Sequence, residues 1–134
     1  MDRGDVRDED YRRLAQFRHE LRRFLKFSEA AARKAGLTPR HHQALLAIRA
    51  GPAQGMLVGA LAERMMVRPH SASGLVDRLV EAGLVERIRD DGDRRQVRVR
   101  ATAAARAMLA SLADSHRAEL RRLKPMLADL IEAL

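Results

Sequence analysis

The sequence predicts a mainly α-helical fold with one small β-hairpin, an α+β class. Apolar residues recur at three- and four-residue steps through most of the chain, as they do on amphipathic helices. Between residues 84 and 101 the period changes to two, which is typical of strands. The composition indicates a folded domain, because 46% of the residues are hydrophobic and 33% are charged. A length of 134 residues fits one domain.

The first part of the chain predicts two helices. The first covers residues 9–35, and its apolar stripe contains Leu14, Phe17, Leu21, Phe24 and Leu25. Gly36 follows as a left-handed stop. Thr38 then supplies an N-cap, and Pro39 a first-turn proline, for a second helix that runs to about Arg49. Residues 50–55 form the clearest loop of the chain.

Two further helices and a hairpin follow. The third helix is short and covers about Val58–Met66, and the fourth runs from Pro69 to Ala82. The fourth has a regular apolar stripe of Ala72, Leu75, Val76, Leu79 and Val80. The alternating segments 84–89 and 97–101 then predict two strands with a charged tip between them.

The C-terminal segment predicts two more helices. Thr102 caps an alanine-rich fifth helix that continues to about Leu123. Pro125 ends that helix and opens a last one, because proline is tolerated only in a first turn. The apolar stripe of the last helix is Leu127, Leu130, Ile131 and Leu134. The order of helix, short helix, turn, helix and hairpin is typical of a winged helix-turn-helix.

The charge balance favours a nucleic-acid partner. The formal net charge is +8, and since three of the 26 basic residues are lysines, the other 23 are arginines. Guanidinium groups suit phosphates and guanine edges. The excess is spread out, with +4 within residues 38–100 and +4 outside them, so many arginines belong to solvated helix faces.

The same composition argues against several other classes of protein. The chain has no cysteine, which removes disulfides, thiol-based sensing and cysteine-ligated zinc. No stretch approaches the roughly 18 apolar residues of a membrane-spanning helix. The polar start of the sequence is not a secretion signal. We therefore expect a cytoplasmic protein without a membrane partner, a metal or another cofactor.

Two features of the predicted winged helix point to DNA. The fourth helix fits a major groove, and small polar residues near its start let the backbone approach closely. The residues expected to contact DNA from this helix and its leading turn are Arg68, His70, Ser71, Ser73, Gly74 and Arg78. The hairpin tip carries Arg94 and Arg95, which can reach a neighbouring minor groove or its phosphates. Asp77 and Arg78 can instead stabilise the helix surface through neighbouring charges.

Three segments carry a specific resemblance. These are Leu61-Ala62-Glu63-Arg64, the run from Leu75 to Arg87, and Asp93-Arg94-Arg95 followed by alternating valines. Together they resemble the MarR (multiple antibiotic resistance regulator) family of winged helix-turn-helix transcriptional regulators. The resemblance implies that residues 69–82 are the recognition helix. It also implies that Asp93 braces Arg95 while the arginine at the tip enters the minor groove.

The flanking helices match the layout of the family, so the resemblance covers nearly the whole chain. It implies one MarR-like domain over residues 1–134, with dimerisation helices at 8–36 and 102–134 around a DNA-binding lobe at 37–101. The departures are local: Ala101-Thr102 with Ala105, Leu57 before the third helix, and Arg68 as a poor N-cap. They affect helix starts but not the fold.

The two terminal helices predict a homodimer. All four aromatic residues lie in the first helix, and neither terminal stripe has an obvious cover within one chain. Pairing two chains would bury both stripes. The residues expected in the interface are Tyr11, Phe17, Leu21, Leu127, Leu130, Ile131 and Leu134. The alternative is that the two ends pack on each other within one subunit.

The resemblance also implies a small aromatic or phenolic effector bound between the dimerisation helices and the DNA-binding lobe. Residues expected near that region are Arg18, His19, His41 and His42. Adjacent histidines on a helix point about 100° apart and do not easily share one metal ion. The lack of a thiol argues against the peroxide-sensing branch of the family.

The resulting hypothesis is a homodimeric, sequence-specific repressor that binds a pseudo-palindromic operator and is released by a ligand. The alternatives are a winged-helix protein that binds DNA without sequence preference, or a protein-interaction module. We do not expect an enzyme. The one hint of an active site is Ser115 beside His116, and neighbours on a helix face different directions.

Overall fold

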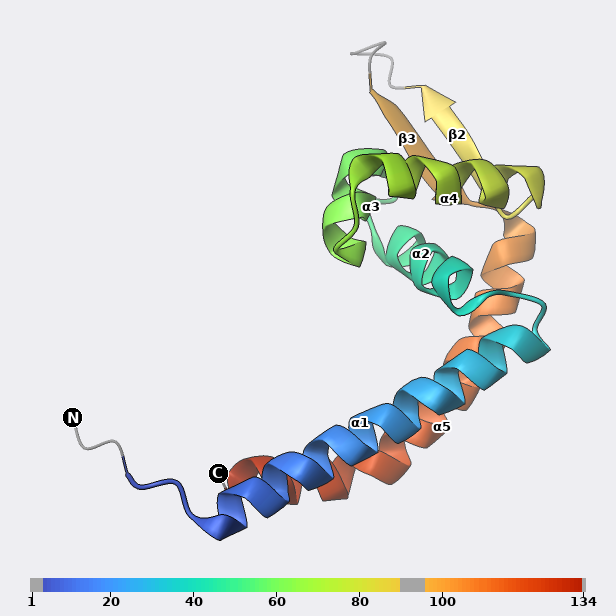
Figure 1. The fold of residues 1–134 in the computed structure, drawn as a ribbon. Helices are drawn as coiled ribbons and strands as arrows, with labels where there is room; N and C mark the ends of the chain where they lie inside the picture. Colours follow the sequence, from blue (N-terminus) through green and yellow to red (C-terminus); the bar gives the residue numbers. More distant parts are fainter. Residues whose placement is uncertain (1–3, 90–95, 134) are drawn as a thin grey trace.

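The computed structural model describes residues 4–89 and 96–133 (Figure 1). Its elements in chain order are α1 (Asp8–Lys34), α2 (Pro39–Ala50), β1 (Met56–Leu57), α3 (Val58–Met65), α4 (Pro69–Glu81), β2 (Val85–Arg89), β3 (Val97–Ala101) and α5 (Ala103–Glu132). This mostly helical chain with a small antiparallel sheet confirms the predicted fold class. None of the helices in the described part is long and apolar enough to cross a bilayer.

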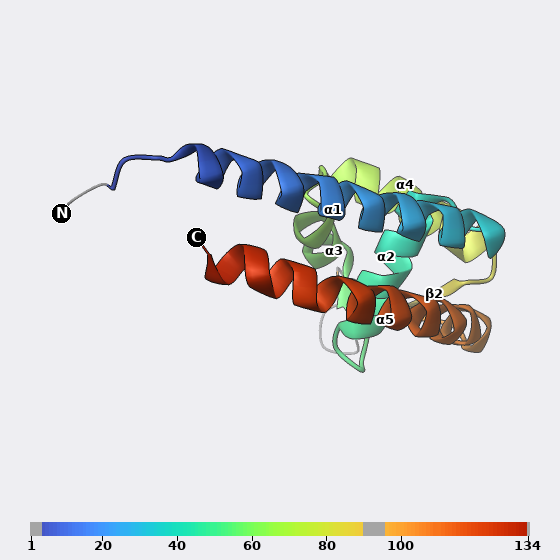
Figure 2. The same cartoon turned by 90° about the horizontal axis from the view of Figure 1, so that it is seen from below.

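The elements form two parts, which we call the lobe and the arm (Figures 1 and 2). The lobe consists of α2, α3, α4 and the sheet, and the arm consists of α1 and α5 side by side. The arm helices are antiparallel. His116 Nε2 lies 2.8 Å from Ser28 Oγ near one end, and Arg13 donates to the Ala133 carbonyl at 2.8 Å near the other.

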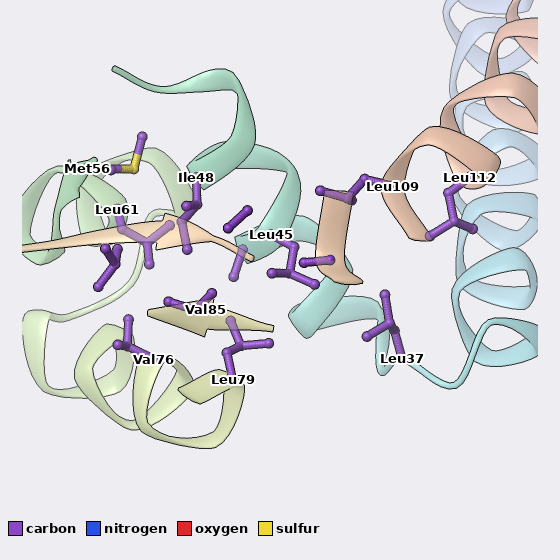
Figure 3. Close-up of a cluster of buried hydrophobic side chains, with 14 of the residues drawn as sticks. Leu37, Leu45, Ile48, Met56, Leu61, Val76, Leu79, Val85, Leu109 and Leu112 are labelled. Atoms are coloured by element: carbon purple, nitrogen blue, oxygen red, sulfur yellow. The ribbon is translucent and has the colours of Figure 1, made fainter. Parts of the chain in front are cut away.

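The hydrophobic core fills the lobe and reaches the nearest turns of the arm (Figure 3). Leu45 of α2, Leu61 of α3 and Leu79 of α4 are completely buried. Each fully buried leucine contributes roughly 1.5–3 kcal/mol from burial alone. Leu109 of α5 joins the same cluster, so the core anchors the arm to the lobe.

The sheet has the order β1-β3-β2, and both pairs are antiparallel. The sequence predicts β2 and β3 but misses β1, whose Met56 pairs with Val99. Gly55 allows this pairing, because its φ is +108° and a Cβ there would lie 3.0 Å from the Arg98 Cβ. A two-residue strand is too short to show a period of two, so the pattern alone could not predict it.

The predicted helix boundaries are confirmed at most ends. Gly36 has a φ of +88°, and the Leu37 amide donates to the Ala32 carbonyl at 2.9 Å, which closes α1 as a Schellman motif does. Thr38 Oγ1 accepts from the His41 amide at 3.1 Å and caps α2. Met66 ends α3 in the left-handed region.

The predicted break at Pro125 is wrong, because α5 continues through it to Glu132. The proline lacks the N–H that would bond the Arg121 carbonyl. Pro125 lies on the exposed side of α5, where solvent can bond that carbonyl. Leu123 on the opposite side is buried, so packing holds the helix together across the missing bond.

Candidate nucleic-acid interface

Helix α4 has one buried and one exposed face. Ala72, Leu75, Val76 and Leu79 are buried against the rest of the lobe. The exposed positions include every residue predicted to contact DNA from this helix and its leading turn: Arg68, His70, Ser71, Ser73, Gly74 and Arg78. The structure therefore brings these six residues together on one surface.

The start of α4 leaves its first-turn amides open. Arg68 occupies the N-cap position with extended backbone and no side-chain cap, and Pro69 follows at the first helical position. Amides without an intrahelical acceptor, at the positive end of the helix dipole, favour a phosphate. Gly74 has open space where a Cβ would stand, so packing does not require glycine there. Because glycine has no side chain, a DNA backbone or base edge can approach the α4 main chain closely at this position.

The wing consists of β2 and β3, and it projects beyond α4 (Figure 1). Glu86 pairs with Arg100 across the two strands, and Arg100 Nη2 donates to Glu86 Oε1 at 2.7 Å. Asp93, Arg94 and Arg95 at the predicted tip lie outside the described residues. The base of the wing, where β2 and β3 join the lobe, thus lies beside the exposed face of α4.

Asp77 of α4 forms an ion pair with Arg87 of β2. Both side chains are exposed, so the pair lies on the surface that α4 and the wing share. The pair ties the helix to the wing, and sequence reasoning missed Arg87. Ten residues separate the two positions, and no helical or strand spacing links them, so no local pattern could have paired them.

The arm keeps an apolar surface exposed. Tyr11 and Leu21 of α1 are 62% and 46% exposed, and Ile131 of α5 is 59% exposed. Phe17, Leu127 and Leu130 are half-buried, and Leu134 lies outside the described residues. The terminal helices thus pack on each other within one chain, and they still leave apolar side chains uncovered.

The four residues expected near an effector do not share one place in a single chain. Arg18 and His19 are exposed on α1. Burial lowers the pKa of His41 below its ordinary value, and Arg78 lowers it further. Burial also lowers the pKa of His42, followed by the neighbouring His116 ring. His41 therefore faces α4, whereas His42 faces α5.

The described residues offer other features that bear on ligands. Among them, no three His, Cys, Asp or Glu side chains are grouped to hold a metal ion. A groove of about 700 Å³ lies between the arm helices, lined by residues that include Phe27, Lys34, Met108, Ser111 and Ser115. The Ser115 hydroxyl donates to the Leu112 carbonyl at 3.1 Å, and His116 faces Ser28 instead.

Helix α3, the turn after Met65, helix α4 and the adjoining β-hairpin define the chain as a winged helix-turn-helix protein. The MarR family model matches residues 35–96, which cover the lobe up to the start of the wing's last strand. The lobe accordingly matches the MarR family of winged-helix regulators, and the resemblance to that family predicted from the sequence is confirmed. The exposed face of α4 is the surface that a helix-turn-helix protein presents to DNA.

Solved structures share the fold over most of the chain. AbsC, a MarR family transcriptional regulator from Streptomyces coelicolor, is 23% identical, with 96% of this chain and 89% of that chain covered and a TM-score of 0.76. CouR from Rhodococcus jostii RHA1 bound to p-coumaroyl-CoA is 26% identical, with 82% and 80% covered and a TM-score of 0.67. A MepR variant from S. aureus bound to an oligodeoxyribonucleotide is 16% identical, with 89% and 93% covered and a TM-score of 0.72. No curated protein sequence matches the chain.

Proposed function

We propose that the chain is a homodimeric repressor that occupies a pseudo-palindromic operator and leaves it when a small aromatic or phenolic effector binds. The observation that carries this proposal is the exposed face of α4, where small polar side chains lie near an uncapped helix start and an arginine stands at each end, Arg68 and Arg78. In this proposal α4 lies in the major groove, and its side chains read base edges. Arg94 and Arg95 reach the adjacent minor groove, and Asp93 braces Arg95.

The exposed stripe of the arm supports the homodimer. Leu21 and Leu25 precede Ser28 and Ala32 by seven residues each, so all four lie on one side of α1. Ala32 belongs to the core cluster shared with the lobe, so the stripe faces the side on which the lobe lies. An apolar stripe of this length is a surface that a second copy covers, with the same patch on both partners.

The symmetry of such a dimer sets the form of the operator. A two-fold axis through the paired arms places two copies of α4 in successive major grooves, about 34 Å apart. Each copy reads one half-site, so the two half-sites are inverted repeats. The MepR variant bound to an oligodeoxyribonucleotide supports DNA as the partner of this fold.

CouR bound to p-coumaroyl-CoA supports a small-molecule effector for a relative of this chain. We assign the effector site to the groove between α1 and α5, whose apolar walls carry a cation at Lys34. An aromatic acid or phenolate offers matching chemistry, with an apolar ring and one negative charge. Binding there changes the packing of the arm and with it the spacing of the two α4 helices.

Selection of bound fragments from random duplex DNA tests the proposal most directly. We expect one enriched motif with inverted-repeat symmetry, bound by two chains per site. Enrichment without a motif, with an affinity that depends only on salt, would instead indicate binding without sequence preference.

Two substitutions separate the roles of the wing and of α4. Arg94→Ala should weaken binding to all sequences, because a minor-groove or phosphate contact carries little base information. Ser73→Ala should weaken binding mainly to operators that carry the preferred base at the positions that Ser73 contacts, by about 1–3 kcal/mol at each. The selected operator and its single-base variants provide the measurement, and equal losses on every sequence from both changes would contradict this division.

A further inference from the structure

Two histidine rings meet where the arm joins the lobe. His42 of α2 belongs to the lobe and is only 6% exposed. His116 of α5 belongs to the arm, and the two ring centroids are 5.2 Å apart with an interplanar angle of 56°. The pair is therefore part of the contact between the lobe and the arm.

His116 is fixed by hydrogen bonds to both of its ring nitrogens. Its Nδ1 lies 2.7 Å from the Leu112 carbonyl oxygen, which can only accept, so Nδ1 carries a hydrogen. In the neutral ring Nε2 is then bare and accepts from the Ser28 hydroxyl at 2.8 Å. A second proton on His116 would reverse this last bond and make Ser28 the acceptor.

The side chains that α1 packs against the pair are uncharged. Helix α1 presents Ser28 and the rings of Phe24 and Phe27, whose centroids lie 5.9 and 5.4 Å from that of His116. Among the residues that the structure describes, no carboxylate forms an ion pair with either histidine. A buried imidazolium without a counter-charge is costly, and two adjacent ones repel each other.

The nearest charged groups on the surrounding elements have other partners. Glu119, one turn further along α5, accepts a hydrogen bond from Arg122 Nη2 at 2.7 Å. It also interacts electrostatically with Arg23 of α1. On α2 the neighbouring His41 faces Arg78 of α4, which opposes rather than supports a positive charge. On α1, Glu29 beside Ser28 is exposed to solvent, and the buried Glu20 lies 3.7 Å from Arg23 Nη1 and 4.0 Å from Arg122 Nη2. Within the described part of the chain, neither carboxylate forms an ion pair with His42 or His116.

We propose that the His42–His116 pair is a proton-binding site that positions the lobe on the arm, so that acidification loosens the joint and weakens DNA binding. The neutral pair packs α2 against α5 and holds α4 at the spacing that the operator requires. A histidine of the pair that gains a proton becomes an imidazolium, and this charge is stable only if water reaches the ring. Water enters when α2 moves away from α5. The lowered pKa of His42, caused by burial and then by His116, agrees with a site that is neutral while packed.

The test is the operator affinity measured by fluorescence anisotropy between about pH 8 and about pH 5.5. For the unmodified protein we expect affinity to fall by about five- to tenfold over this range. His116→Gln and His42→Gln each leave one ring and should bind at about pH 8 within about twofold of the unmodified protein, with most of the fall removed. His19→Gln is the matched control, since this exposed histidine lies on α1, outside the pair and outside the exposed face of α4, and should leave the fall in place.

The inference rests on the proposed function, and the two fail differently. If no variant binds any selected duplex at about pH 8, the proposed function is wrong. If all bind there and both Gln variants show the same pH profile as the unmodified protein, only the inference is overturned. Should the variants not fold, NMR titration of the unmodified protein decides. One ring of the pair should resist protonation well below the other, whereas two independent titrations near the ordinary histidine value would refute the coupling.

Discussion

Both the lobe and the arm contain buried leucines, but among the described residues exposed leucines are more frequent in the arm. In the lobe, Leu45, Leu61 and Leu79 are wholly buried by elements of the same chain. In the arm, Leu21 and Leu120 remain 46% and 49% exposed although the two helices pack along each other. The leucines of the lobe core are thus covered within one chain, whereas the arm exposes a surface that a second copy would cover. Substitutions in the two parts should consequently change different quantities.

The largest effect is expected in the lobe core. Leu79→Ala should lower the free energy of unfolding by about 2–5 kcal/mol, because it removes buried methyl groups and leaves a cavity. Urea denaturation followed by circular dichroism measures the change. Leu46→Ala on the exposed side of α2 is the control, and it should change stability by less than about 0.5 kcal/mol. Equal losses at both positions would show that the core is not where the structure places it.

A smaller but more specific effect is expected in the arm. Leu21→Glu should weaken self-association about tenfold to a hundredfold, because a carboxylate would have to be buried in the interface. Sedimentation velocity over a concentration series measures it, and operator affinity should fall in parallel. Leu46→Glu is a closely matched control, since Leu46 is 51% exposed but lies on the lobe. A dimer that resists Leu21→Glu and dissociates with Leu46→Glu would place the interface on the lobe instead.

Periodicity predicted the helices well, and it failed where an element depends on a distant partner. The stripe of α4 and the caps at Gly36 and Thr38 are local features, and the structure confirms them. Strand β1 exists only because β3 pairs with it, and α5 passes Pro125 only because Leu123 packs on the far side. Such long-range causes leave no repeating trace in the sequence.

The candidate site shows the same division. The exposed residues of α4 follow from its helical period, so the sequence located that surface. The Asp77–Arg87 pair and the contact of His42 with His116 join segments that no spacing relates. Glu20 is a further example: it is 2% exposed, although α1 reads as a charged face at that position. Burial of such a group is decided by the helix packed over it, not by its neighbours in the chain.

Acidification should destabilise the folded chain. The pKa values of His41 and His42 are lowered by burial, so the folded state binds protons less tightly than the unfolded state, whose histidines titrate near about pH 6.5. The stabilisation that comes from keeping these two histidines neutral is fully present above the pKa of the unfolded state. It declines as the pH falls below that pKa. Urea titrations at a series of pH values measure the slope. His42→Gln should reduce this slope, whereas His19→Gln on the exposed side of α1 should not.

The smallest change in stability is expected at the Asp77–Arg87 pair. Both side chains are exposed, so breaking the pair should change the free energy of unfolding by only about 0.2–1 kcal/mol. The two single substitutions should nevertheless move DNA affinity in opposite directions. Asp77→Asn removes a negative charge beside the phosphates and should strengthen binding a few fold, whereas Arg87→Gln leaves that charge unpaired and should weaken it. Anisotropy titrations at two salt concentrations measure both, and both differences should shrink at the higher one. Changes of the same sign would mean that the pair acts by holding the wing against α4 and not through its charge.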